Sequence, residues 1–337
     1  MTTRFAVLGD GAWGTAMALL LAQDPGHRVI LWSAREDNGR LLRERRENLR
    51  LLPGVPIPES VGLTTDIRLA LDGAELLVIA IPTVYLRETL QRIQPACGSG
   101  QPIVSLTKGL ENHTFLRPSE IVAQVLGTKS VAVLSGPSHA EEVSRGRPTT
   151  VVVASSDYDL ARGIQDSFHT ERFRVYTNLD IVGVELGGAL KNIIGIAAGI
   201  ADGLGLGDNA KSALMTRGLV EMARFGVALG AEQQTFFGLA GLGDLITTCI
   251  SPHGRNRHVG ERLGRGEQLS DILAGMSMVA EGVNTTRSVH EKATLLGLEM
   301  PITTEIFRVL YEHKDPWLAV SDLMLREPKS EALGDTC

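Results

Sequence analysis

The chain of 337 residues is poor in cysteine, aromatic residues and positive charge. Its three cysteines, Cys97, Cys249 and Cys337, form no CxxC pair and no metal-ligand spacing, which predicts reduced thiols, a cytoplasmic location and no metal. Aromatic residues make up 4% of the chain, and its net charge is −6. Nucleic-acid binding through bulk positive charge is therefore disfavoured. An anionic ligand would have to be held by a local group of basic residues.

Targeting and membrane-anchoring segments are also scarce. Residues 1–4 run directly into a strand-like segment, without the charged and apolar regions of a secretory signal. The stretch 181–200 is long and apolar enough to resemble a membrane span, but Glu185, Lys191 and Asn192 within it would be costly in lipid. We therefore expect a buried helix and no membrane span.

Hydrophobic residues, at 43%, are abundant enough for sizeable cores, and the 37 glycines indicate many tight turns and close backbone contacts. In the first half, short apolar runs alternate with segments of helical length. This alternation predicts an α/β fold whose N-terminal part, residues 1–179, is a doubly wound Rossmann-type domain with parallel strands. The predicted strands are Phe5–Leu8, Val29–Trp32, Leu76–Ile81, Ile103–Leu106, Val131–Leu134, Thr150–Val153 and Arg174–Tyr176, and the predicted helices include Thr15–Gln23 and Glu36–Leu49.

From about residue 179, helical patterns punctuated by glycine replace the strands. We expect a mostly helical substrate and catalytic domain over residues 180–330, and a frayed polar tail over residues 331–337. The apolar character of the helical part favours a homodimer. The arginine-rich segment Arg35–Arg50 also holds four acids, so a solvated helix face is favoured over a nucleic-acid patch.

A glycine motif of the dinucleotide-binding type follows the first predicted strand. Gly9, Gly11 and Gly14 form G-x-G-x-x-G between a strand and a helix, the context that gives the motif its meaning. The first glycine permits a tight turn, the second admits a pyrophosphate, and the third lets the helix pack closely on the strand. The sequence thus predicts an NAD or NADP site, which includes Ala12 and Trp13; the alternative is a glycine-rich turn alone.

The end of the second predicted strand bears on the choice between NAD and NADP. About 20 residues beyond the glycine motif, an acidic residue commonly holds the ribose hydroxyls. The sequence there reads Trp32-Ser33-Ala34-Arg35. We expect Arg35 to contact the 2′-phosphate of NADP, although Glu36 and Asp37 weaken this expectation. A surface arginine is the alternative.

Lysine is rare, with seven residues, and two of them lie in unusual surroundings. Lys108 follows a buried strand, at the carboxyl end of the sheet where doubly wound folds bind ligands. Lys191 lies within the apolar helix, on a face where Gly187, Gly188 and Gly195 carry no side chains. One interpretation is an unpaired lysine that snorkels to solvent. We favour a lysine in a hollow that admits a substrate, with its pKa lowered by burial toward the range of proton transfer.

A basic segment, Pro252–His258, combines arginine and histidine with glycine and asparagine. A guanidinium fork and turn amides suit a phosphate, and the alternative is an exposed basic loop. Asp244, between two glycine-rich turns, is placed to align Lys191 or a substrate hydroxyl.

Six strings resemble those of a known family. In order, they are Gly9–Ala16, Thr107–Leu110, Ser135–Ala140, Glu185–Asn192, Gly241–Asp244 and Gly254–Arg257. The combination resembles the NAD(P)-dependent glycerol-3-phosphate dehydrogenases of bacteria over essentially the whole chain. The resemblance implies hydride transfer between NAD(P)H and dihydroxyacetone phosphate to give sn-glycerol 3-phosphate, a backbone for phospholipids.

The resemblance also implies roles for individual residues, with Lys191 as proton donor and acceptor. The candidate substrate contacts are Lys108, Gly136, Ser138, Lys191, Asn192, Asp244, Thr248, Gly254, Arg255 and Asn256. The candidate cofactor contacts are Gly9, Gly11, Ala12, Trp13, Gly14, Arg35, Lys108, Ala140, Arg255, Val279 and Glu281. The chain departs from the family's frequent serine at Ala12 and Gly254, and from its basic residue or histidine at Ala34.

Two other functions stay open at this point. A β-hydroxyacid dehydrogenase on the same scaffold would need a carboxylate clamp in place of the Gly254–Arg257 cluster. A non-catalytic protein that senses NAD(P) would not need Lys108, Lys191 and Asp244.

Overall fold

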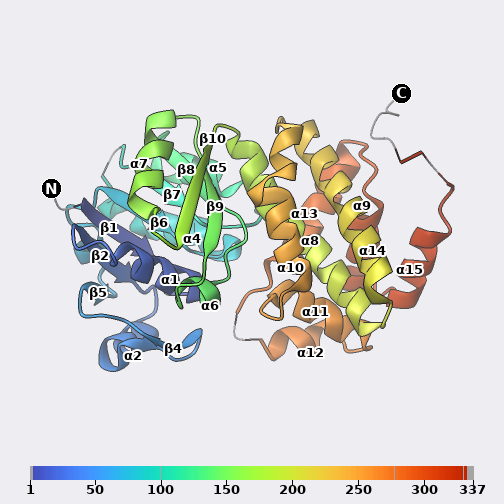
Figure 1. Ribbon diagram of the computed structural model, residues 1–337, viewed down its shortest axis with the longest axis horizontal. Coiled ribbons are helices and arrows are strands. Elements are labelled where there is room, and N and C mark those ends of the chain that lie inside the picture. Colours follow the sequence, from blue (N-terminus) through green and yellow to red (C-terminus); the bar gives the residue numbers. More distant parts are fainter. Residues whose placement is uncertain (1–2, 99, 277, 329, 332–337) are drawn as a thin grey trace.

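The computed structural model describes residues 3–98, 100–276, 278–328 and 330–331. The predicted tail, apart from residue 331, lies outside this part of the chain. A sheet flanked by helices forms one side of the molecule, and an array of helices forms the other (Figure 1). The elements of the first side are β1 (Thr3–Leu8), α1 (Ala12–Leu21), β2 (His27–Trp32), α2 (Glu36–Arg45), β3 (Glu47–Asn48), β4 (Leu52–Pro56), β5 (Val61–Thr64), α3 (Ile67–Leu71), β6 (Leu76–Ile79), α4 (Thr83–Ile93), η1 (Gln94–Ala96), β7 (Ile103–Ser105), α5 (Pro118–Leu126), β8 (Val131–Ser135), α6 (Ala140–Val143), β9 (Thr149–Ala154), α7 (Tyr158–Phe168) and β10 (Phe173–Asn178).

The elements of the second side are helical throughout the described residues. They are α8 (Ile181–Gly203), α9 (Gly207–Ala228), η2 (Gln233–Phe237), η3 (Leu239–Gly243), α10 (Asp244–Ile250), α11 (Arg255–Gly264), α12 (Leu269–Ala274), α13 (Glu281–Leu295), α14 (Pro301–Tyr311) and α15 (Pro316–Met324). The division into domains at residues 179 and 180 stays a prediction.

The main sheet has the strand order β10-β9-β8-β7-β6-β1-β2-β5. Because side chains alternate along a strand, Phe5 and Val7 pack beneath α1 and α7, whereas Ala6 and Leu8 face α3, α4 and α5. The doubly wound α/β class is therefore confirmed. The expectation of parallel strands is wrong at one place, because β9 pairs with β8 in the antiparallel sense and β10 follows β9.

Two of the local features that differ from the sequence-based expectations lie between β2 and β6. Strand β5 was not predicted, since its four residues include Gly62 and form no long apolar run. The predicted helix Glu36–Leu49 ends at Arg45, because Arg46 adopts the left-handed conformation with φ of 48°. The guanidinium of Arg46 donates to the carbonyl oxygens of Ile57 and Val61 at 3.1 and 3.0 Å.

The glycine turn lets the backbone of α1 pack closely against the sheet. Gly9 has φ of +114°, and a Cβ atom there would lie 2.6 Å from the Ala80 carbonyl oxygen. A Cβ atom at Gly14 would lie 1.9 Å from the Gly9 oxygen, whereas one at Gly11 would meet nothing within 4 Å. Gly11 is the N-cap of α1 and supplies no side-chain cap. The turn is thus open at Gly11, where the amides of α1 begin.

Helix α8 is the core of the second side. Among the described residues it is the one helix long and apolar enough to cross a membrane, but 89% of its most apolar window is buried inside the protein. Helix α11 packs on it with almost no side chains between, since a Cβ atom at Gly260 would lie 1.9 Å from the Ile196 oxygen. The expectation of a buried helix is confirmed.

A buried carboxylate ties α8 to the sheet side. Glu185 accepts hydrogen bonds from Arg117 Nη1 at 2.6 Å and from the Ser119 amide at 2.8 Å, at the start of α5. Burial raises the pKa of Glu185, although Arg117 acts in the opposite direction. This contact fixes the helix that carries Lys191 against the sheet.

Candidate active site

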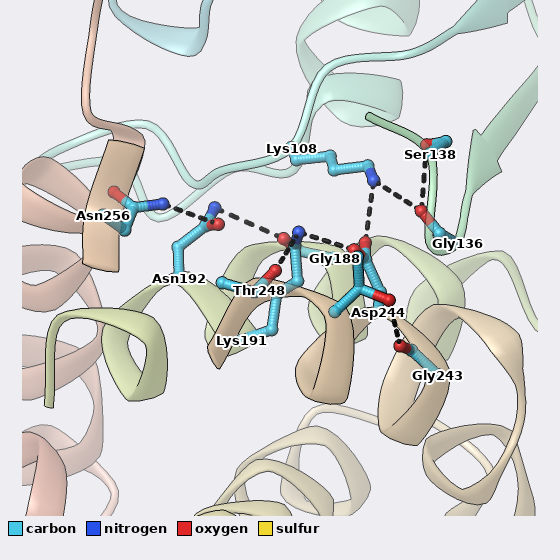
Figure 2. A network of polar contacts seen from close by, with 11 residues as sticks. Lys108, Gly136, Ser138, Gly188, Lys191, Asn192, Gly243, Asp244, Thr248 and Asn256 are labelled. Atoms are coloured by element: carbon cyan, nitrogen blue, oxygen red, sulfur yellow. Dashed lines mark hydrogen bonds and ion pairs between the residues drawn. The ribbon is translucent and has the colours of Figure 1, made fainter. Parts of the chain in front are cut away.

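Two lysines share one carboxylate where β7 and β8 end. Lys108 follows β7, Lys191 lies in the middle of α8, and Asp244 is the first residue of α10. Lys191 Nζ donates to Asp244 Oδ1 at 2.6 Å, and Lys108 Nζ donates to Asp244 Oδ2 at 2.7 Å (Figure 2). Lys108 Nζ also donates to the Gly136 carbonyl oxygen at 3.0 Å. Residues distant in the sequence thus meet in one network.

Glycines in α8 allow this meeting. A Cβ atom at Gly188 would lie 2.7 Å from Ser135 Oγ, and one at Gly187 would lie 2.8 Å from the Ala240 oxygen. The helix can therefore approach the end of β8 and η3 closely, and Lys191 follows one turn later. Thr248, one turn after Asp244, accepts a second hydrogen bond from Lys191 at 2.6 Å.

Burial and neighbouring charges shift the pKa values of Lys191 and Asp244 in opposite directions. The side chains of Lys191 and Asp244 are 10% and 3% exposed. Burial lowers the pKa of Lys191 to about 8, with Asp244 raising it and Lys108 lowering it further. Burial raises the pKa of Asp244, but both lysines outweigh it, and the pKa lies below its ordinary value. The snorkelling alternative for Lys191 is wrong, because its ammonium group is buried and bonded to Asp244 and Thr248.

Two asparagines continue the network away from the lysines. Asn256 Nδ2 donates to Asn192 Oδ1 at 2.9 Å, and Asn256 Oδ1 accepts from the Gly282 amide at 2.9 Å. Both asparagine side chains are buried. Asn192 directly follows Lys191 in α8, so its bond with Asn256 holds the start of α11 beside Lys191.

The basic segment supplies the first turn of α11. Gly254 is its N-cap without a side-chain cap, and Arg255 is its first residue. Arg255 is exposed, and its Nη1 donates to the Val279 carbonyl oxygen at 2.8 Å. A guanidinium and the free amides of a helix N-terminus therefore lie together, a combination that suits a phosphate.

Buried polar atoms without a hydrogen-bond partner in the described structure accompany the glycine turn and the start of α13. They include Trp13 Nε1, Thr83 Oγ1 and Glu281 Oε2. The other Glu281 oxygen accepts from the Thr83 amide at 2.8 Å. Burial raises the pKa of Glu281 to about 7, although Thr83 and Arg255 lower it. Unpaired donors and acceptors, together with the open turn at Gly11, fit a ligand with phosphate and amide groups, as NAD(P) has.

Other predicted cofactor residues gather near this turn. Ala12 and Ala140 are buried in one apolar cluster, and Trp13 and Met278 pack against it. Val279 follows Met278, and its carbonyl oxygen accepts the hydrogen bond from Arg255 described above. The structure thus brings the predicted cofactor residues of α1, α6 and the segment before α13 together.

Arg35 lies apart from the lysine network, whereas Ser138 joins it. Arg35 is exposed, and its Nε and Nη2 donate to the Asp37 carboxylate at 3.2 and 2.9 Å. Ser138 Oγ donates at 2.9 Å to the Gly136 carbonyl oxygen, the same oxygen that accepts from Lys108 (Figure 2). Within the part of the chain that the structure describes, Arg35 has no hydrogen bond to this network.

Sequence reasoning missed Thr83, Ser135 and His139, whose buried Oγ1, Oγ and Nε2 atoms have no partner in the described structure. The His139 ring lies 5.8 Å from that of His253, edge to face. Burial lowers the pKa of His139, and Lys191 lowers it further. Their position could have indicated them, since all three follow or end a strand at the carboxyl edge of the sheet.

Comparison with known proteins decides the family. Residues 4–161 match the family model described as the NAD-dependent glycerol-3-phosphate dehydrogenase N-terminus, and residues 180–321 match the corresponding C-terminus. The chain belongs to this family. It is therefore an oxidoreductase that uses a nicotinamide dinucleotide and a small-molecule substrate.

Individual dehydrogenases of this family are similar over nearly their whole length. A glycerol-3-phosphate dehydrogenase [NAD(P)+] of Chlorobium phaeobacteroides is 50% identical over 97% of this chain and 99% of its own. One of Geobacillus thermodenitrificans is 53% identical over 96% and 95%. The crystal structure of the Coxiella burnetii glycerol-3-phosphate dehydrogenase matches with a TM-score of 0.92 and 40% identity, over 96% of this chain and 99% of that one.

Proposed function

We propose that this chain interconverts dihydroxyacetone phosphate and sn-glycerol 3-phosphate with NAD(P)H, and that Lys191 transfers the proton. The observation that carries the proposal is the buried Lys191–Asp244–Lys108 network, at the carboxyl edge of a dinucleotide-binding sheet. A carboxylate substrate would require different anchoring groups, and a sensing protein would have no use for a lysine whose pKa is about 8.

The proton chemistry follows from this network. The dinucleotide, when bound, donates a hydride to the carbonyl carbon or accepts one from the alcohol carbon. Lys191, as an ammonium, donates its proton to the substrate oxygen during reduction and takes it back, as an amine, during oxidation. Two ammonium groups face one carboxylate, so the network is net positive where the oxygen gains negative charge. Asp244 and Thr248 hold Nζ in place.

The phosphate end of the substrate is assigned to the start of α11. Arg255, Asn256 and the amides after Gly254 bind it, and the bond between Asn256 and Asn192 fixes its position relative to Lys191. Gly136 and Ser138, which lie next to Lys108, are assigned to the substrate as well. Binding the phosphate at a distance from the carbonyl orients the reacting carbon.

The cofactor is assigned to the glycine turn and its neighbours. Gly9, Gly11 and Gly14 shape the turn, and the amides at the start of α1, with Ala12 and Trp13, bind the pyrophosphate. Ala140, Val279 and Glu281 extend the site toward the lysines. A contact between Arg35 and a 2′-phosphate would require its pair with Asp37 to open.

The cellular setting is proposed on less direct support. Glycerol 3-phosphate from this reaction supplies phospholipid synthesis, and the free thiols Cys97 and Cys249 suit the cytoplasm. Trp317, Leu318 and Met324 of α15 are exposed large hydrophobic residues, which supports a homodimer. Size-exclusion chromatography with light scattering tests the homodimer directly.

An absorbance assay at the nicotinamide band tests the activity. Dihydroxyacetone phosphate should be reduced with NADH or NADPH, whereas unphosphorylated 2-oxo and 3-oxo acids should not. Reduction of the acids in preference to the phosphate would favour the β-hydroxyacid dehydrogenase. Cofactor binding without turnover of either substrate would favour the sensing protein.

A further inference from the structure

An acidic side chain stands at the end of β2, although no acidic residue follows that strand directly. Asp10, from the glycine turn after β1, points its Oδ2 at Ser33, the first residue beyond β2. Ser33 Oγ donates to that oxygen, and Asn38 Nδ2 donates to it at 2.5 Å. The carboxylate thus lies where β1 and β2 both end.

The sheet places Asp10 there. Strands β1 and β2 are parallel, with Leu8 opposite Trp32, and the Gly9 amide continues the ladder to the Trp32 oxygen at 3.1 Å. Asn48 Nδ2 donates to the Asp10 carbonyl oxygen at 2.8 Å. Backbone and side chain of Asp10 are therefore both held, and the carboxylate has a fixed direction.

In dinucleotide-binding folds, a carboxylate at the end of the second strand accepts hydrogen bonds from the ribose hydroxyls and repels a 2′-phosphate. We propose that Asp10 fills this role from the glycine turn, and that the chain consequently binds NAD in preference to NADP. The inference rests on the dinucleotide site proposed above. Both hydrogen bonds to the Asp10 carboxylate in the described structure go to Oδ2, which leaves Oδ1 for a ribose hydroxyl.

The surrounding charges favour the same choice. Arg35, the cation expected to bind a 2′-phosphate, is held by Asp37 through two hydrogen bonds. Asp37 and Asp10 both act electrostatically on Arg35, so a phosphate beside this guanidinium would also meet two carboxylates. Glu36 and Asp37 also occupy the first turn of α2, where a phosphate would otherwise meet helix amides.

Calorimetric titration of the full chain with 5′-AMP and with 2′,5′-ADP tests the inference without turnover. These probes differ only in the 2′-phosphate. The natural chain should bind 5′-AMP more tightly. Asp10→Asn keeps the size and one acceptor oxygen but removes the charge, so it should raise the affinity for 2′,5′-ADP relative to 5′-AMP about tenfold. The ratio of kcat/KM for NADPH and NADH should shift in the same direction.

Asp208→Asn is the matched control, since it removes an exposed aspartate charge at the start of α9, outside the dinucleotide-binding side. It should leave the ratio of the two affinities unchanged. Asp10→Ser provides a second variant with a short polar side chain, and circular dichroism confirms that each variant folds.

Two results would overturn the inference. The first is an unchanged affinity ratio in a folded Asp10 variant. The second is a natural chain that prefers 2′,5′-ADP and loses this preference in Arg35→Ala, which would assign the ribose end to Arg35. Failure of the natural chain to bind either probe would instead contradict the dinucleotide site itself, so the two failures are distinguishable.

Discussion

Lys191 and Asp244 are 53 residues apart in the chain, and their side chains meet in a buried hydrogen bond of 2.6 Å. The ammonium comes from the middle of an apolar helix and the carboxylate from the start of another. Burial alone would push the lysine toward its neutral form, whereas the carboxylate keeps it charged. Their balance leaves the pKa of Lys191 at about 8, so that the group can both give and take a proton near neutral pH.

Replacement of this lysine should abolish turnover. Lys191→Ala removes the proton donor and its positive charge, and we expect kcat to fall by about 10³-fold or more. The start of α1 is untouched, so NADH binding by fluorescence titration should survive. Lys129→Ala, which changes an exposed lysine, is the control. Undiminished turnover in Lys191→Ala would contradict the assigned role.

The pH dependence should differ between the two directions of the reaction. Reduction needs protonated Lys191, so its kcat/KM should fall as pH rises through about 8. Oxidation needs the neutral amine, so its kcat/KM should rise through the same range. Stopped-assay rates at constant ionic strength from pH 6 to 10 measure both limbs of the pH profile, the falling one for reduction and the rising one for oxidation.

Two substitutions should move these limbs in opposite directions. Lys108 lowers the pKa of Lys191, so Lys108→Met should shift the limb to higher pH. Asp244 raises that pKa, so Asp244→Asn should shift it to lower pH. Both variants will be slower than the natural enzyme, but only the position of the limb is diagnostic. Shifts of the same sign would show that another group titrates.

The phosphate contact should appear in KM rather than in kcat. Arg255→Ala removes a charge-assisted hydrogen bond worth about 1.5–3 kcal/mol, so the KM for dihydroxyacetone phosphate should rise about 10- to 100-fold. Turnover of unphosphorylated dihydroxyacetone should change little, because it has no phosphate to lose. Arg265→Ala, at the far end of α11, is the control. An unchanged KM would assign the phosphate elsewhere.

Local patterns in the sequence predict much of this architecture. The apolar runs identified seven strands of the main sheet, and the glycine motif located the turn at Gly9. Lys191 is a candidate site residue because burying an ammonium group in an apolar helix is costly unless the group has a function. These features are visible without knowledge of distant contacts, since each depends on neighbours within a few residues.

Features that depend on distant partners were not predictable. The reversal of β9 follows from its pairing with β8, and the sequence of β9 is as apolar as that of a parallel strand. The sequence does not indicate Asp10, because its carboxylate lies at the end of a strand other than its own.

Burial of a second carboxylate predicts a pH effect on stability. Glu221, in α9, accepts hydrogen bonds from the Ile302 amide at 2.6 Å and the Thr303 amide at 3.1 Å, at the start of α14. Burial raises its pKa to about 7, although these bonds lower it. An unfolded glutamate titrates near about 4.3, so the folded state binds the proton more tightly between these values. The contribution of Glu221 to the free energy of unfolding therefore falls as pH rises from about 4.3 to 7.

Glu221→Gln should remove this dependence, because the amide keeps an acceptor oxygen and has no charge. The extra buried NH₂ of glutamine costs a similar free energy at every pH, so the informative quantity is the difference in Tm between variant and natural protein. That difference should move in favour of the variant by about 2 °C or more between pH 4.5 and 7.5 in calorimetric scans. Glu232→Gln, at an exposed position, should show no such trend. A difference that stays constant with pH would mean that Glu221 is ionised throughout, with the amides of α14 compensating fully for its burial.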